Sequence, residues 1–134
     1  MKSCLLEVKV KKIVLISTIA VYHYPVLVDE ASSIDDSKLT PYGYNRYNLE
    51  NYIQDKFDTT IIRLPALFGE GLKKNIIFDL INKKYTESIN IHSSYQFYNL
   101  DKLSNDINIA MNNNLKILNV ATEPIKIIEV INTC

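Results

Sequence analysis

Tyr42 and Arg46 are the residues whose types and spacing most directly suggest catalysis. They lie four residues apart in the segment Pro41-Tyr-Gly-Tyr-Asn-Arg46, and residues i and i+4 of a helix share one face. A phenol has an ordinary pKa of about 10, and a neighbouring positive charge favours the phenolate form. A tyrosine beside a fixed cation is therefore suited to proton exchange with a bound oxygen, and Tyr42 with Arg46 is a candidate pair for this chemistry.

Thr18 is a third candidate, because it follows a segment that reads as a buried strand. The continuous apolar run Ile13–Ile16 predicts a strand that is covered on both faces. Thr18 would then lie near the carboxyl end of this strand, where its hydroxyl can hydrogen-bond a reacting oxygen and hold it in place. Ser17, the neighbouring residue, is the alternative candidate for the same role.

The segment that carries the tyrosine has the signals of a helix start. Thr40-Pro41 combines a suitable N-cap residue with a proline at the first helical position, and the apolar spacing that follows predicts a helix to about Phe57. Residues 22–40 contain proline and several Asp and Ser residues, which predicts a surface loop. Thr59–Leu64, rich in Thr and Ile, predicts the next strand, and Pro65 ends it.

Strands and helices continue to alternate further along the chain. Leu103, Ile107 and Met111 recur at helical spacing and indicate one apolar helix face. This alternation predicts an α/β fold with a parallel sheet and crossover helices. The other predicted elements are a helix tail in the first ten residues, helices over 72–82 and 100–112, short strands over 88–92 and 96–98, a strand over 116–121, and a helix from 124 to the end.

Five segments, in order, resemble the extended short-chain dehydrogenase/reductase family, which includes the NAD-dependent epimerases and dehydratases. Thr18 lies four residues before Tyr22, as a Ser or Thr does at the family's strand end, and Tyr42-Gly-Tyr-Asn-Arg46 resembles the family's Tyr-x-x-x-Lys motif. The resemblance covers nearly the whole chain from about residue 12 onward. The remaining three segments are Ile62-Arg-Leu-Pro-Ala-Leu-Phe-Gly69, Phe97-Tyr-Asn-Leu-Asp101 and Ile117-Leu-Asn-Val-Ala-Thr-Glu-Pro124.

This resemblance implies roles for individual residues. Tyr42 would be the general acid/base, Thr18 the positioning group and Arg46 the cation. Tyr42, Arg46, Pro65 and Leu67 would contact the cofactor, which would be NAD or NADP. Arg46 stands where the family commonly has lysine. Because a planar guanidinium differs from an ammonium in hydrogen-bond geometry, this exchange affects binding of the cofactor ribose more than activation of the tyrosine.

A second departure from the family is the absence of a Gly-rich dinucleotide-binding turn. The three glycines, Gly43, Gly69 and Gly71, form no G-x-x-G-x-x-G pattern after a strand, whereas the family's fold begins with a strand, a Gly-rich turn and a helix. We therefore expect the C-terminal portion of that fold. It would be a partial Rossmann-like parallel sheet with crossover helices, without the N-terminal half of the doubly wound sheet. Residues 1–134 would form one partial NAD(P)-binding domain, with a small substrate-side region over about 70–115.

The resemblance implies an NAD(P)-dependent oxidoreductase or epimerase that acts on a nucleotide-linked sugar or a similar hydroxylated substrate, in a truncated form. Ile19-Ala20 stand where dehydratases of the group carry an acid pair, which disfavours dehydration. Two alternatives stay open. The chain could be a catalytically inactive fragment, or a half-domain that pairs with itself or with another chain to complete the sheet. In the latter case the strand edge at Ile13–Ile16 would be the docking surface.

Composition and charge exclude several classes of partner. Lys plus Arg and Asp plus Glu each number 15, so the formal net charge is zero, which gives no general attraction to nucleic acid or to an anionic membrane. No apolar run approaches the ~20 residues of a membrane span, and the charges at Lys2, Glu7 and Lys9 do not fit a signal peptide. Cys4 and Cys134 have no metal-ligand spacing and predict reduced thiols in a cytoplasmic protein.

Other polar residues have structural as well as functional interpretations. Arg63 is predicted to be a structural ion-pair partner. Lys73-Lys74-Asn75 would either contact an anionic substrate such as a nucleotide sugar or form a solvated helix start. His92 has no partner at ligand spacing, so no metal site is predicted, and Asp101 and Asp106 are expected on a helix surface or at a helix cap.

Overall fold

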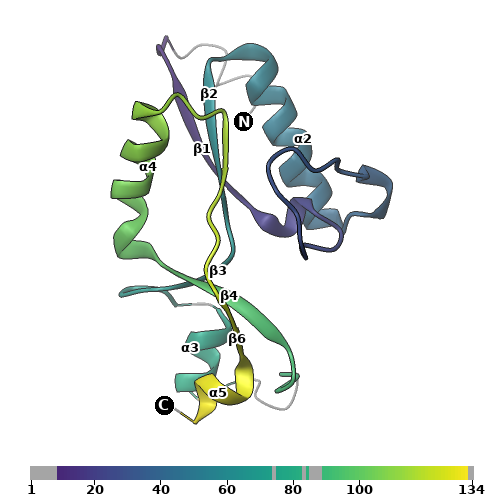
Figure 1. Ribbon diagram of the computed structural model, residues 1–134, viewed down its shortest axis with the longest axis vertical. Helices are drawn as coiled ribbons and strands as arrows, with labels where there is room; N and C mark the ends of the chain where they lie inside the picture. Colours follow the sequence, from purple (N-terminus) through teal and green to yellow (C-terminus); the bar gives the residue numbers. More distant parts are fainter. Residues whose placement is uncertain (1–8, 74, 83, 85–88, 133–134) are drawn as a thin grey trace.

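Two small β-sheets with helices around them make up the described part of the protein (Figure 1). The structure is a computed structural model, and it describes residues 9–73, 75–82, 84 and 89–132. One sheet has the strand order β1-β2-β5 and the other the order β3-β4-β6. The helix tail predicted for the first ten residues falls almost wholly outside the described residues, and so do Cys4, Lys74 and Cys134.

The first sheet is parallel and has β2 at its centre. β1 (Ile13–Thr18) pairs with β2 (Thr59–Leu64), and β2 pairs with β5 (Ile117–Asn119). All six residues of β2 are buried, as expected for a strand with neighbours at both edges and helices on both faces. Because the strands are parallel, they end at the same edge of the sheet, and Thr18 lies at that edge.

Helices α2 (Pro41–Lys56) and α4 (Leu103–Asn112) cover opposite faces of this sheet (Figure 1). Successive side chains of a strand point to opposite faces, and β2 illustrates this. Ile62 belongs to a buried apolar cluster that contains Ala110 of α4, whereas its neighbour Arg63 forms a buried ion pair with α2. One face of β2 is therefore apolar and the other carries a charge.

The start of α2 confirms the sequence prediction. The Thr40 side chain accepts a hydrogen bond of 3.2 Å from the Gly43 N–H, and Pro41 is the first helical residue. At Gly43 the helix packs against the short 3₁₀-helix η1 (Ile19–Val21). A Cβ atom on Gly43 would lie 2.1 Å from the carbonyl oxygen of Ala20, so this close approach requires glycine.

The second sheet is mixed. β4 (Ser94–Asn99) lies between β3 (Ala66–Phe68), to which it is parallel, and β6 (Pro124–Lys126), to which it is antiparallel. The short helices α3 (Ile76–Ile81) and α5 (Ile127–Ile131) both appear at the lower end of the view in Figure 1. This sheet joins the first through β2, which is followed after one residue by β3, and through β4, which leads into α4.

Two predicted elements near the second sheet are wrong. Residues 89–92 form no strand, Ser88 lies outside the described residues, and the strand that follows in the described part of the chain is β4. The helix predicted from Pro124 begins only at Ile127, because residues 124–126 pair with β4 as β6. Proline lacks an N–H group, which suits an edge strand of this kind.

Other predicted elements exist but have different bounds. The helix predicted over 72–82 is the shorter α3, because the Asn75 side chain caps it by accepting a 2.7 Å hydrogen bond from the Phe78 N–H. The helix predicted over 100–112 begins with the 3₁₀ turn η4 (Leu100–Lys102) and continues as α4. The strand predicted over 116–121 is reduced to the three residues of β5. The loop predicted over 22–40 contains one 3₁₀ turn, η2 (Asp36–Lys38), and strand β3 has no counterpart in the prediction.

β1 is less covered than its apolar sequence predicts. Ile13, Val14 and Leu15 are half-buried, and Ile16 is 37% exposed. The reason is that β1 lies at the edge of its sheet and pairs, among the described strands, only with β2. The α/β class, the parallel sheet and the crossover helices are confirmed, and together they form a partial Rossmann-like fold. None of the helices within the described ranges has the length and apolar character needed to cross a membrane.

Candidate active site

Thr18 lies at the carboxyl end of β1 and caps the turn that follows. Its Oγ1 accepts a hydrogen bond of 3.2 Å from the Ala20 N–H, and its side chain is half-buried. A hydroxyl has one proton to donate as well as lone pairs that accept. No described residue accepts a hydrogen bond from the Thr18 hydroxyl, so its proton can point to a bound molecule.

Tyr42 and Arg46 lie together on α2, as their spacing predicts. The Arg46 guanidinium carbon stands 5.5 Å from the centroid of the Tyr42 ring, which is within the range of a cation–π interaction. Tyr42 is 54% exposed and Arg46 is half-buried. The phenol therefore meets solvent beside a permanent positive charge, an arrangement that suits proton exchange with a bound oxygen.

A cavity of about 400 Å³ opens beside the carboxyl end of β1. Its size falls within the range of small-molecule sites. The structure brings Thr18 and Pro65 together here, whereas Leu67 packs against the apolar cluster around Ile62. Tyr42 does not line the cavity, but Thr40, two residues before it, does. The lining residues are Thr18, Ile19, Ala20, Tyr22, His23, Pro25, Thr40, Pro65, Ala66 and Tyr95.

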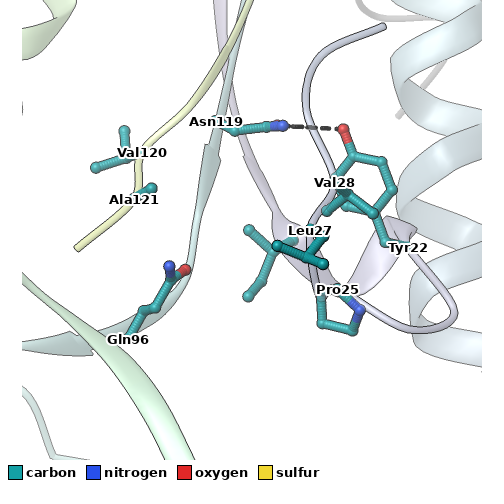
Figure 2. A pocket seen from close by; sticks show the side chains of 9 residues that line it. Tyr22, Pro25, Leu27, Val28, Gln96, Asn119, Val120 and Ala121 are labelled. Carbon is teal, nitrogen blue, oxygen red and sulfur yellow. Dashed lines mark hydrogen bonds between the residues drawn. The ribbon is translucent and has the colours of Figure 1, made fainter. Parts of the chain in front are cut away.

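A smaller cavity of about 90 Å³ shares Ile19, Tyr22 and Pro25 with the first and is also lined by Asn119 (Figure 2). Tyr22 and Asn119 both line it, and the Asn119 Nδ2 donates a 3.0 Å hydrogen bond to the tyrosine hydroxyl. The Asn119 backbone N–H also donates, over 2.6 Å, to the Glu30 carboxylate. These bonds fasten the loop after β1 to the end of β5, and Tyr22 and Pro25 of this segment line both cavities.

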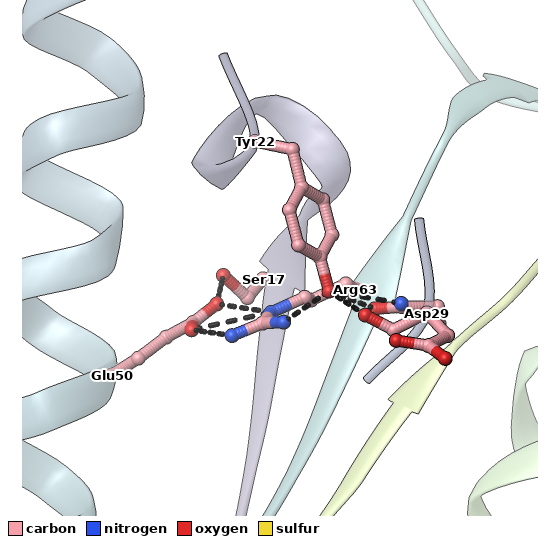
Figure 3. Close-up of polar contacts among 6 residues, drawn as sticks. Ser17, Tyr22, Asp29, Glu50 and Arg63 are labelled. Atoms are coloured by element: carbon pink, nitrogen blue, oxygen red, sulfur yellow. Dashed lines mark hydrogen bonds and ion pairs between the residues drawn. The ribbon is translucent and has the colours of Figure 1, made fainter. Parts of the chain in front are cut away.

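A buried polar cluster of Ser17, Tyr22, Glu50 and Arg63 lies beneath the candidate site (Figure 3). Arg63 donates to both Glu50 carboxylate oxygens, at 2.6 Å from Nη2 to Oε2 and 3.2 Å from Nε to Oε1. The Ser17 hydroxyl donates to Glu50 Oε1, and Arg63 Nη1 donates to the Tyr22 hydroxyl at 2.7 Å. All four residues are at most 7% exposed, so strands β1 and β2 and helix α2 share one set of buried bonds.

The charges in this cluster are balanced. Burial alone lowers the pKa of Arg63, but the hydrogen bonds and charge of Glu50, with Tyr22, raise that pKa above its ordinary value. The guanidinium therefore stays charged, and every buried side-chain nitrogen or oxygen among the described residues has a hydrogen-bond partner. The prediction that Arg63 is a structural ion-pair partner is confirmed. Its partner Glu50 and the role of Tyr22 were not predicted.

The remaining candidates lie away from this site. Asn75 caps α3 and also donates from Nδ2 to the Leu67 carbonyl at 2.8 Å, and Lys73 is exposed. His92 is exposed as well, and within the described ranges no group of three or more His, Cys, Asp or Glu residues could hold a metal ion. Asp106 accepts a 2.6 Å hydrogen bond from the Tyr98 hydroxyl, and Asp101 is exposed in η4.

No protein-family model and no curated protein matches this sequence. Several solved structures match its fold. A NAD-dependent NDP-hexosamine 5,6-dehydratase involved in tunicamycin biosynthesis has a TM-score of 0.78 at 18% identity, with 97% of this chain and 48% of that chain covered. The UDP-N-acetylglucosamine 4-epimerase from Methanobrevibacter ruminantium M1, in complex with UDP-N-acetylmuramic acid, has a TM-score of 0.73 at 16% identity, with coverage of 92% and 45%.

A third structure is a mutant of UDP-glucuronic acid 4-epimerase from Bacillus cereus, in complex with NAD and UDP-4-deoxy-4-fluoro-glucuronic acid. Its TM-score is 0.72 at 18% identity, with 98% of this chain and 46% of that chain covered. These three neighbours in fold are thus one dehydratase and two epimerases named for nucleotide sugars; the dehydratase is NAD-dependent and the UDP-glucuronic acid 4-epimerase holds NAD. The resemblance to the extended short-chain dehydrogenase/reductases is confirmed at the level of the fold. The chain spans slightly less than half the length of these structures.

Proposed function

We propose that this chain supplies the part of an active site that contains the catalytic tyrosine, in an NAD(P)-dependent oxidoreductase or epimerase that acts on a nucleotide-linked sugar. The observation that carries the proposal is the contact between Gly43 and Ala20, where a Cβ would lie 2.1 Å from a carbonyl oxygen. Tyr42 precedes Gly43, and Thr18 lies two residues before Ala20. The contact therefore brings the start of α2 to the segment that bears Thr18, next to a cavity of about 400 Å³.

The chemistry follows from the three side chains. NAD(P), when bound, accepts a hydride from a sugar carbon or returns one. Tyr42 takes up the proton that leaves the attached hydroxyl during oxidation, and returns it during reduction. Thr18 donates a hydrogen bond to the same oxygen, and the guanidinium of Arg46 is the fixed cation beside the Tyr42 ring.

The residues of the chain fit one end of a dinucleotide. Arg46 and Tyr42 offer a charge and a hydroxyl beside the helix start, and Pro65 lines the cavity with Thr18. Leu67 stays part of the proposed cofactor contacts, although it packs toward the core. Within the described ranges no Gly-rich turn is available for the pyrophosphate. We also propose a cytoplasmic location, and a substrate-side region over about residues 70–115.

The test is NAD-dependent conversion of UDP-glucose or UDP-glucuronic acid by the purified 134-residue chain. We expect slow turnover that Tyr42→Phe abolishes and Tyr44→Phe leaves intact. Tyr44 is a matched control because it is 44% exposed on the same helix. Equal activity in both variants would contradict the assignment of Tyr42. An absence of NADH binding and turnover in the unmodified chain would contradict autonomous activity and favour the inactive-fragment alternative.

A second candidate function is a half-domain that binds another polypeptide, or a second copy, to complete the sheet. It is supported by the edge position of β1 and by the 37% exposure of Ile16 on that strand. An exposed apolar edge strand is a template for strand addition. The predicted result is a stable complex, seen by light scattering, that binds NADH more tightly than the isolated chain. A protein that stays monomeric at every concentration would exclude self-pairing.

A further inference from the structure

We propose that Glu50 is a positioning residue for the candidate active site, acting through Ser17 and Arg63 to hold the start of α2, which bears Tyr42, in a fixed position beside the β1–η1 segment, which bears Thr18. The inference rests on the proposed function for its catalytic consequence, and on the geometry of the buried polar cluster for the positioning itself. Glu50 lies on the same helix as Tyr42 and is completely buried.

Glu50 continues the stripe of α2 that carries Tyr42 and Arg46. The three residues are spaced by four, and each step of four residues turns about 40° around a helix axis. The stripe therefore passes from the exposed Tyr42, through the half-buried Arg46, to the fully buried Glu50. Fixing Glu50 fixes the rotation of the helix about its axis, and hence the direction in which Tyr42 points.

Glu50 also fixes the strand that bears Thr18. It accepts a hydrogen bond from the hydroxyl of Ser17, the residue immediately before Thr18. Neighbouring side chains of a strand point to opposite faces, so a Ser17 side chain held toward α2 directs the Thr18 side chain away from it. Thr18 lines the cavity, which agrees with this orientation.

The β1–η1 segment thus touches α2 on both sides of Thr18. Ser17 binds Glu50 before it, and Ala20 contacts Gly43 after it. Two contacts fix both the distance and the rotation of a helix relative to a strand, whereas one contact leaves the helix free to pivot. Arg63 completes the arrangement because it neutralises Glu50 and binds it to the central strand β2.

Ser17→Ala is the most selective test, because it removes the bond between β1 and Glu50 but leaves the ion pair with Arg63. The matched control is Ser37→Ala, which removes a 2.6 Å hydroxyl–carboxylate bond to Asp35 on the exposed loop. The readout is hydrogen exchange of the Ala20 and Gly43 amides, which are bound to the side chains of Thr18 and Thr40. We expect exchange at both amides to quicken by about tenfold or more in Ser17→Ala, with amides of β2 unchanged. Ser37→Ala should change neither amide.

A second readout concerns catalysis. In a chain that turns over substrate, Ser17→Ala should lower kcat by about tenfold while KM stays close to its original value, because misplacement of a reacting group affects the chemical step. Ser17→Thr, which restores the hydroxyl, should recover part of the loss. If neither protein has activity, the proposed function fails, and the exchange data still decide the positioning role.

Unchanged exchange at Ala20 and Gly43 in a folded Ser17→Ala protein would overturn the proposal. If that variant does not fold, the proposal is tested by measuring amide hydrogen exchange in the unmodified protein at increasing urea concentrations below the unfolding transition. The two amides should then open together with the amides of β1, in one cooperative step. Opening of Gly43 at lower urea than β1, as simple fraying of the helix start, would equally overturn the proposal.

Discussion

The two sheets of this protein differ in how deeply their strands and polar contacts are buried. In the parallel sheet, β2 is wholly buried and is tied to β1 and α2 by an ion pair whose side chains are 3% and 1% exposed. In the mixed sheet, all three residues of β6 are exposed, and α3 contains no buried residue. Buried polar groups have strict geometric requirements and so specify one arrangement. The candidate catalytic residues Thr18 and Tyr42 lie on β1 and α2, the two elements that these buried polar contacts tie to β2.

The largest expected effect comes from breaking the ion pair. Arg63→Ala leaves Glu50 buried without its countercharge, and loss of one partner of a buried pair costs about 3–5 kcal/mol of the free energy of unfolding. Urea denaturation measures the change. A loss below about 1 kcal/mol, the range of surface ion pairs, would show that the parallel sheet does not depend on this contact and would remove the contrast between the sheets.

The contact at the start of α2 should be the next most sensitive. Gly→Ala in a helix usually stabilises it by about 0.5–1 kcal/mol, but Gly43→Ala places a Cβ against the Ala20 carbonyl. We expect a net loss of about 2 kcal/mol, the range for overpacking, together with altered amide shifts in η1. Asn45→Ala, at an exposed position of the same helix, is the control and should not destabilise the protein. A stabilised Gly43→Ala protein would contradict the close approach.

In the mixed sheet, the next largest effect should come from Tyr98, whose hydroxyl donates a 2.6 Å hydrogen bond to Asp106. Burial, and then the hydrogen bond and charge of Asp106, raise the pKa of Tyr98 above its ordinary value of 10.0. A group with a raised pKa in the folded state stabilises the protein fully below its unfolded pKa, and this contribution is lost as the pH rises through the folded pKa. The unmodified protein should therefore lose stability above about pH 10.

Tyr98→Phe should lower the free energy of unfolding by about 1.5 kcal/mol at neutral pH, the value of one hydrogen bond to a charged group. It should also flatten the decline above pH 10. Tyr95→Phe, on the same strand and 39% exposed, is the matched control and should keep the decline. Identical pH profiles for Tyr98→Phe and the unmodified protein would assign the decline to another group.

The smallest effect should come from the exposed pair of Asp58 and Lys116, whose charged atoms are 2.6 Å apart. The hydrogen bond from Lys116 lowers the pKa of Asp58, so its contribution exists above the ordinary pKa of 3.8 and is lost as the pH falls through the lowered value. Because both side chains meet solvent, we expect Asp58→Asn to unfold at the same urea concentration at neutral pH. A loss comparable with that of Arg63→Ala would refute the view that burial makes the difference.

The sequence alone predicts those features of the fold that depend on residues close together in the chain. The cap at Thr40, the bounds of α2 and β2, and the spacing of Tyr42 and Arg46 depend on neighbouring residues, and the structure agrees with them. β6 was missed because its conformation is set by pairing with β4, about 30 residues away. The sequence predicts too much burial for β1, because an apolar run does not indicate whether a strand lies at the centre or at the edge of a sheet.

Glu50 was missed for a related reason. A glutamate in a helix is ordinarily a solvated residue, and its burial follows only from contacts with Ser17 and Arg63, which lie 33 and 13 residues away. One signal was present, since Glu50 follows Arg46 at the same interval at which Arg46 follows Tyr42. In the sequence Tyr22 marks only the end of a strand, whereas in the structure its hydroxyl binds Arg63, Asn119 and the Asp29 carbonyl.

The central claim is that Thr18 and the start of α2 border a site for NAD(P) and a nucleotide sugar. A titration of the ¹⁵N-labelled protein with NADH and then UDP-glucose, followed by amide chemical shifts, tests it most directly. The account predicts shifts at Thr18, Ala20 and Ala66, which line the cavity, and at Gly43, with Phe78 on α3 as an unaffected reference. Shifts confined to the mixed sheet, or no shifts at the cavity, would contradict it.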